Sequence, residues 1–177
     1  KPSGLLARRS RRLSFPAPAD VAELVGTTDS EVYFAVVRRH LRAADSDEVA
    51  RLTAIASAVN EVRAAYPDAC LNAFVLDRTG LIVVHSAGSA ATPLPAFAER
   101  GFTPEALPSG HGSDYNTLRV VRVASGAFVV STTGVDQAGW QALPADSVSL
   151  IDAAGILSVP IEPAVPDARF TSDPVCP

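Results

Sequence analysis

The sequence predicts an α+β protein in which N-terminal helices pack on an antiparallel sheet of about six strands, with extended arms at both ends. Segments with helical periodicity and N-cap residues lie between residues 20 and 66, and three hairpin patterns follow residue 70. Neither end of the chain shows periodicity. The 177 residues are 47 % hydrophobic, which is enough to bury one core. We therefore expect one domain over 20–160, an arm at 1–19 and a proline-rich arm at 161–177. The longest apolar runs are far shorter than the roughly 20 residues of a membrane span.

Three helix starts carry a capping-box pattern, in which a cap residue is followed three positions later by glutamate. They are Asp20 with Glu23, Thr28 with Glu31, and Asp45 with Glu48. The first helix is short because Gly26 can end it, and the second spans about 30–42. The third has an apolar stripe from Val49 to Tyr66 and stops at Pro67. Charged and polar residues on its other face are expected to face solvent: Glu48, Arg51, Asn60, Glu61 and Arg63.

Three hairpins are predicted, over residues 70–86, 117–133 and 147–160. The first turns at Asp77–Gly80 and the last at Asp152–Gly155, and the two segments align without gaps. Asp opens such a turn and Gly closes it, so we attribute the likeness to turn chemistry rather than to duplication.

The connections between hairpins are rich in Gly, Pro and Ser. Within 86–116 we expect one short helix at 94–100 and a flexible piece at 108–114. The segment 137–143, which holds the single tryptophan Trp140, is a second short connection with helical character.

The net charge of −4 is unevenly distributed. Residues 1–13 hold five basic and no acidic residues, whereas residues 14–177 hold 10 basic and 19 acidic ones, a net −9. A basic arm on an acidic body can bind acidic protein or anionic lipid, but the body would repel a nucleic acid backbone. An arginine-rich start without acids is also typical of an organellar transit peptide, so a mitochondrial location is our first hypothesis and secretion the alternative.

The arms supply the candidate partner-binding residues. These are the apolar Leu5, Leu6, Leu13, Phe15 and Phe170 and the basic Arg8, Arg9, Arg11 and Arg12.

No arrangement of residues points to catalysis, a cofactor or a metal. His40, His85 and His111 show no metal-ligand spacing, and there is no nucleophile elbow or phosphate loop. His85 is expected to be packed or at a rim, whereas His111 lies in a loop where catalytic residues often occur. Cys70 could pair with Cys176 in an oxidising compartment, but we favour Cys70 as a buried core residue and Cys176 as an unpaired thiol in the C-terminal arm.

The long helix followed by the Ala73–His85 hairpin resembles the start of PAS-like Cache sensor domains, and the layout is also similar to roadblock and profilin-like interaction modules. The likeness covers about 47–86. In such sensors the central loop reads the ligand, and here that region offers few charged or aromatic groups. They are Arg100, His111, Asp114 and Tyr115.

A second resemblance concerns enzymes. Gly101-Phe102 followed by Ser131–Thr133 looks like part of the bacterial ADP-ribosyltransferase pattern, which also needs a strand arginine and a later glutamate. Arg78 and Glu162 would have to fill these roles, from a predicted turn and a proline-rich arm.

The sequence therefore favours a non-catalytic accessory subunit of a larger protein assembly, which contacts its neighbours through its arms. The alternatives are a ligand-sensing domain of the Cache type, with a closed pocket between the sheet and 86–116, and an ADP-ribosyltransferase-like enzyme.

Overall fold

The computed structural model describes residues 17–22, 24–26, 28–107, 111–112, 114–132 and 139–162. Most of both predicted arms lies outside these ranges. All nine candidate partner-binding residues lie there too, namely Leu5, Leu6, Arg8, Arg9, Arg11, Arg12, Leu13, Phe15 and Phe170, and so does Cys176.

The α+β class is confirmed. The helices are α1 (Pro18–Ala22), α2 (Asp29–Arg42), α3 (Glu48–Ala65) and α4 (Leu94–Glu99), with a 3-10 helix η2 (Pro104–Ala106). The strands are β1 (Ala73–Leu76), β2 (Leu81–His85), β3 (Arg119–Arg122), β4 (Phe128–Ser131), β5 (Gln141–Ala142), β6 (Ser147–Ile151) and β7 (Ile156–Pro160). The strands do not form one sheet: four pair in the order β1-β2-β6-β7 and three in the order β4-β3-β5.

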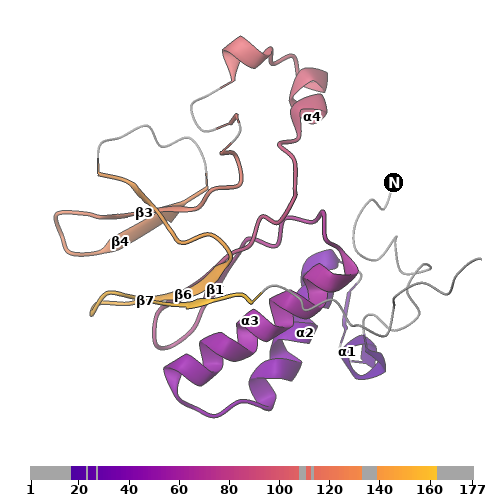
Figure 1. The fold of residues 1–177 in the computed structure, drawn as a ribbon, viewed down its shortest axis with the longest axis vertical. Helices are drawn as coiled ribbons and strands as arrows, with labels where there is room; N and C mark the ends of the chain where they lie inside the picture. The colour runs from indigo at the N-terminus through magenta and orange to yellow at the C-terminus, as the bar shows by residue number, and fades with distance from the viewer. Residues whose placement is uncertain are drawn as a thin grey trace, which may run out of the picture.

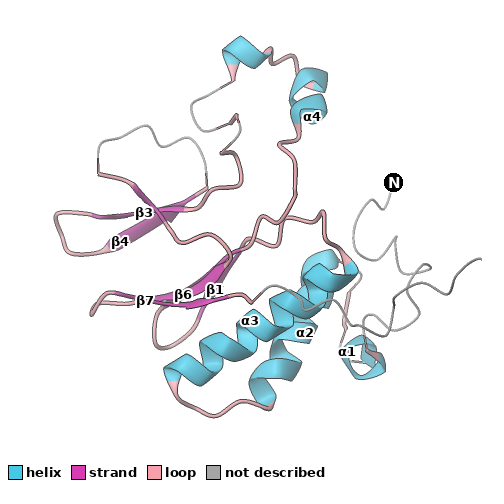
Figure 2. Ribbon diagram, in the orientation of Figure 1, coloured by secondary structure: helices cyan, strands magenta, loops and turns pink. Residues whose placement is uncertain are grey.

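The described elements stack in three layers, with α2 and α3 on one face of the four-stranded sheet and the three-stranded sheet on the other (Figures 1 and 2). The period of two along β2 explains how one strand serves both cores. Ile82 and Val84 pack with the helices, whereas Leu81 and Val83 pack with the second sheet. The hairpin predicted over 117–133, which is β3–β4, belongs to the second sheet. Strands β2 and β6 are buried on both faces, and the second sheet covers the face that is turned away from the helices.

The helix starts match the sequence prediction in one case of three. Thr28 caps α2 with a complete capping box, because its side chain accepts from the Glu31 N–H and the Glu31 carboxylate accepts from the Thr28 N–H. Helix α3 begins two residues later than expected, with Asp47 rather than Asp45 as its N-cap. The prediction for Asp20 is wrong, since α1 begins at Pro18 and the buried Asp20 carboxylate accepts from Arg39 Nε at 2.9 Å.

Several α3 side chains expected to face solvent join the layers instead. Arg51 pairs with Asp77 in the β1–β2 turn, and Glu61 accepts from Arg39 Nη2 at 2.6 Å. Arg63 donates to Ser86 Oγ at 2.6 Å and also pairs with Asp146. The apolar stripe is confirmed from Leu52 onward. Its charged flanks hold α3 against α2 and the sheet, a role that helical periodicity alone does not reveal.

The described residues between β2 and β3 (86–107, 111–112 and 114–118) form an excursion that stands away from the helix layer (Figure 1). It contains α4 where the sequence predicts a helix. The two sides of the excursion are joined near its base, where Asn116 Nδ2 donates to Ala90 O at 3.0 Å. The excursion is also bound to the chain just before β1, because Asn72 Nδ2 donates to Asn116 O at 2.7 Å. At the other predicted connection, residues 141–142 form strand β5 rather than a helix.

Candidate functional site

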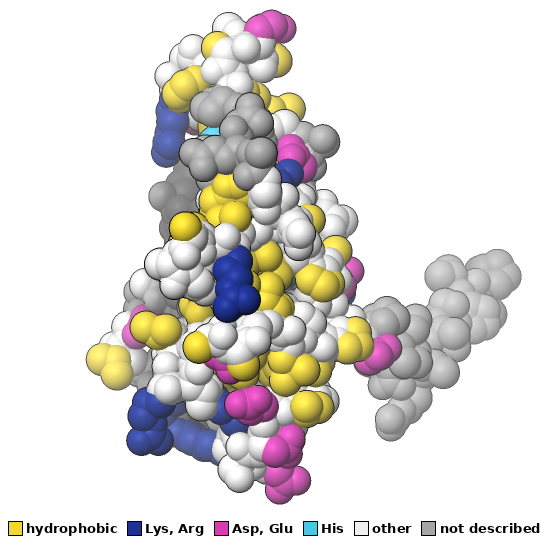
Figure 3. Space-filling model, turned by 90° about the vertical axis from the view of Figure 1, so that its left-hand side faces the viewer, with side chains coloured by type: hydrophobic (Ala, Val, Ile, Leu, Met, Phe, Trp, Pro, Cys, Tyr) yellow, Lys and Arg dark blue, Asp and Glu magenta, His cyan; other side chains and the backbone are white. Residues whose placement is uncertain are grey.

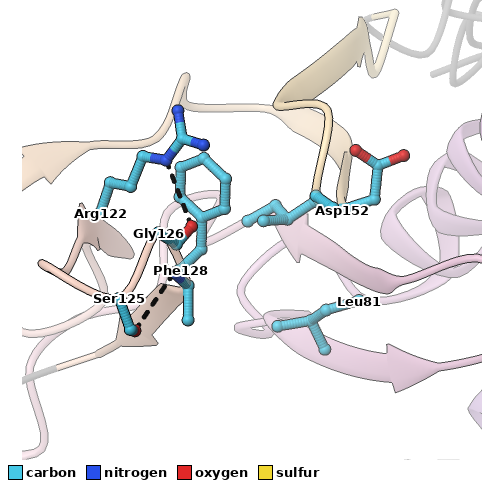
Figure 4. Close-up of a pocket in the computed structure, with 9 residues that line it drawn as sticks. Leu81, Arg122, Ser125, Gly126, Phe128 and Asp152 are labelled. Carbon is cyan, nitrogen blue, oxygen red and sulfur yellow. Dashed lines mark hydrogen bonds between the residues drawn. The ribbon is translucent and has the colours of Figure 1, made fainter.

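The space between the two sheets opens at one end into a cleft of about 520 Å³. The β3–β4 hairpin forms one wall and the β6–β7 turn with the start of β2 forms the other (Figure 4). Its lining residues are Leu81, Arg122, Ser125, Gly126, Ala127, Phe128, Ile151, Asp152 and Ala153. On the face toward which these turns point, hydrophobic side chains surround a basic side chain (Figure 3). We call this space the inter-sheet cleft.

Arg122 is held at the cleft by its own hairpin. It pairs with Phe128 across the β3–β4 ladder, and its guanidinium carbon lies 5.3 Å from the centre of that ring. Its Nε donates to Gly126 O at 3.2 Å. Gly126 has φ +85°, a conformation that side-chain-bearing residues rarely adopt, and this geometry turns its carbonyl toward Arg122. The two terminal nitrogens of Arg122 remain available at the cleft, with no carboxylate partner among the described residues.

The floor of the cleft is apolar and rests on a close approach of two strands. Leu81 pairs with Ile151 between β2 and β6, and Gly80 precedes this pair. A Cβ atom on Gly80 would lie 2.5 Å from Ile151 O, so only glycine fits there. The backbone contact therefore fixes where the two floor side chains lie.

Asp152 supplies the acidic group of the cleft. Its Oδ1 accepts from the N–H groups of Ala154 at 2.7 Å and Gly155 at 3.0 Å, the turn chemistry that the sequence predicts. Asp77 makes the matching pair of bonds in the β1–β2 turn. Asp152 therefore lies on the wall opposite Arg122, with its carboxylate held in its own turn and pointing away from Arg122 (Figure 4).

The other end of the same space is closed by His85, which is 5 % exposed. Its Nε2 accepts from the Leu118 N–H at 3.3 Å. This bond assigns the ring proton to Nδ1, which donates to the carbonyls of Leu143 and Pro144, each at 3.1 Å. With both nitrogens bound to backbone, His85 connects the two sheets. Its sequence interpretation as a packed residue fits this position.

Burial and hydrogen bonding raise the pKa values of two side chains outside the cleft, Tyr33 and Arg39. Burial raises the pKa of Tyr33 well above its ordinary value, and its hydroxyl donates to Leu71 O at 3.1 Å. The hydrogen bond to Asp20 raises the pKa of Arg39. Both groups connect layers of the body and lie outside the cleft.

A smaller apolar pocket of about 270 Å³ lies within the excursion. Leu94, Phe97 and Phe102 are among its lining residues, and Phe97 lies 5.6 Å from the ring of His111 and 5.5 Å from that of Tyr115. His111, the histidine that sequence position favoured for catalysis, thus belongs to an aromatic cluster.

The remaining predicted groups are spread over the fold. Arg78 lies in the β1–β2 turn, Ser131 ends β4 in the other sheet, and Glu162 follows β7. The expectation that Cys70 is buried in the core is wrong, because it lies in the connection between α3 and β1 as an exposed free thiol. In the described ranges no cluster of three or more His, Cys, Asp or Glu side chains could hold a metal ion, and no helix there is both long and apolar enough to cross a membrane.

No family model, curated protein or solved structure matches the chain. The inter-sheet cleft is therefore a candidate site on the geometry of its lining residues alone. Sequence reasoning missed Arg122 and Phe128 as a pair, although both flank the predicted Ala124–Gly126 turn at positions that share one face of a hairpin.

Proposed function

We propose that this chain is a non-catalytic accessory subunit that binds other proteins in a larger assembly. The observation that carries the proposal is that buried polar side chains of the body are engaged in hydrogen bonds that hold the fold together. The side chains of His85, Ser86 and Ser149, which could serve chemistry elsewhere, bind backbone or structural partners within the body. The larger of the two described cavities is instead an open cleft with both apolar and polar walls, which is typical of recognition rather than of a water-excluding active site.

The arms are the proposed main contacts. Their leucine and phenylalanine side chains would anchor in pockets of a neighbour, and the four arginines Arg8, Arg9, Arg11 and Arg12 would contact acidic protein or an anionic lipid surface. Nucleic acid is not among the proposed partners, because the body carries most of the acidic residues.

The test is the size of the tagged full chain in native extract. We expect it to migrate well above its own mass of 18.4 kDa, and a variant without residues 1–19 to shift toward that mass. A variant with the four arginines changed to glutamine separates charge from apolar contact. A full chain that migrates as a monomer would contradict the proposal, and unchanged migration of the truncated chain would remove the N-terminal arm from it.

Ligand sensing is the second candidate function. The cleft volume of about 520 Å³ lies in the range of small-molecule sites, and it combines apolar walls with few polar groups. This favours a thermal shift with small organic anions or amino acids. A shift with a free amino acid in a monomeric chain would support sensing over assembly.

A further inference from the structure

We propose that the inter-sheet cleft binds a short partner segment in which one acidic side chain lies between apolar ones. This inference rests on the proposed role in protein binding and adds the chemistry of the segment that is recognised.

Several arginines of the body form ion pairs within the chain. Arg39, Arg51, Arg63 and Arg119 each pair with a carboxylate of the same chain. Arg122 has no carboxylate partner among the described residues and contacts the Gly126 carbonyl and the Phe128 ring instead. These two contacts orient the guanidinium, and within the described part of the chain its terminal N–H groups make no hydrogen bond. A planar guanidinium fits a carboxylate through two parallel hydrogen bonds.

The walls of the cleft limit what surrounds that carboxylate. Leu81 and Phe128 come from different sheets and offer partly exposed apolar surface next to Arg122, whereas Ile151 lies buried beneath them. A partner that placed only a charge here would leave this surface in water. An apolar side chain beside the acidic one would cover it, at roughly 25 cal/mol per Å² of apolar surface removed from water.

Asp152 adds a negative charge at the edge of the far wall. Its Oδ1 accepts two backbone N–H groups of its own turn, and its carboxylate points away from Arg122 (Figure 4). It therefore leaves Arg122 to a carboxylate from outside and disfavours a second acidic group at the far wall.

The experiment uses the full chain and two N-acetylated, C-amidated peptides, Leu-Glu-Leu and its isostere Leu-Gln-Leu, followed by NMR. The expected signals are shifts of the Arg122 Nε–H and of the backbone amides of Gly126, Ala127 and Ala153. We expect the glutamate peptide to bind at least about 10-fold more tightly than the glutamine peptide, since a charged hydrogen-bond pair is stronger than a neutral one.

Two variants complete the test. Arg122→Glu should abolish binding of the glutamate peptide, whereas Arg100→Glu, which changes an exposed arginine after α4 in the same way, should leave it unchanged. Equal binding of both peptides, full binding by Arg122→Glu, or shifts that avoid the cleft would overturn the inference. The titration reads the cleft without any assembly, so its failure is distinguishable from a full chain that migrates as a monomer in extract.

Discussion

The two ends of the space between the sheets differ in whether it is closed or open and in how a polar side chain is placed there. At the His85 end, strand β2 meets the chain that leads into β3 and the chain that leaves β5, and one buried ring satisfies backbone groups from both. At the Arg122 end the sheets diverge into an open cleft, and a cation lies on an aromatic ring. Leu81 and His85 are the two ends of one five-residue strand.

This difference indicates that His85 stabilises the fold, whereas Arg122 is placed to bind a partner. A buried polar side chain stabilises a fold only when its hydrogen bonds are all made, which is the case for His85. Arg122 is exposed, and the described body neither buries it nor gives it an acid. Substitutions at the closed end should therefore affect stability, and those at the open end should affect binding.

The largest effect is expected from His85→Ala. The change removes a buried ring and leaves the Leu118 N–H and the carbonyls of Leu143 and Pro144 without their partner, which should lower the free energy of unfolding by about 3 kcal/mol. Urea denaturation measures this. The control is His40→Ala, whose partly exposed hydrogen bond with Glu61 should contribute less than about 1 kcal/mol. Equal losses in both variants would contradict the role of His85 as the closure between sheets.

Gly80→Ala should rank second. Its new Cβ would collide with Ile151 O at the floor of the cleft, and strands β2 and β6 would have to separate. We expect a loss of about 2 kcal/mol in thermal or chemical unfolding. Gly112→Ala is the matched control, because a Cβ there meets no atom within 4 Å. If Gly80→Ala is as stable as Gly112→Ala, the floor of the cleft is less rigid than the close approach indicates.

The helix layer provides a reference away from both ends. Thr28→Ala removes the N-cap of α2 and should cost about 1 kcal/mol, measured by urea denaturation. Hydrogen bonds from the Thr28 and Gly26 backbone hold the pKa of Glu31 below its ordinary value of 4.5. A lowered pKa means that this stabilisation is present above the ordinary value and is lost as the pH falls through the folded-state value.

An acid titration of the unfolding midpoint checks that sign. The loss of stability below pH 4.5 should be smaller in Glu31→Gln than in the unmodified chain. The same acid dependence in both would contradict a capping role for the Glu31 carboxylate.

The smallest effect on stability is expected at the open end. Arg122→Glu should change the free energy of unfolding by no more than about 0.5 kcal/mol, because an exposed side chain without an acidic partner contributes little. A loss as large as that of His85→Ala would mean that Arg122 is structural, and the distinction between the two ends would fail.

Much of the fold could be predicted from local sequence because the signals are local. The Thr28–Glu31 capping box, the apolar stripe of α3 and the Asp152–Gly155 turn each depend on residues within a few positions. The box and the turn appear as expected, and so does the stripe from Leu52 onward, whereas its predicted first residue, Val49, is exposed. Asp20 was misjudged for the opposite reason. Its side chain binds Arg39, 19 positions away, and this contact exists only after α1 and α2 pack.

The candidate site was less accessible to sequence reasoning. The arm residues could be identified by composition, but they lie outside the described ranges, and what they bind stays a proposal. The cleft needs the β3–β4 turn, the β6–β7 turn and the start of β2 to meet, and no local pattern encodes that meeting. The one available signal was the pairing of Arg122 with Phe128 across a predicted hairpin turn.

The sequence by itself determined the α+β class, because helical and strand periodicities reflect which faces of each element are apolar. Only the tertiary structure decided that the strands divide into two sheets and that their shared interior is closed by His85 and open at Arg122. The physical reason is burial on both faces of β2 and β6: a strand that is apolar on both sides requires two covers, but its sequence does not say which segments supply them.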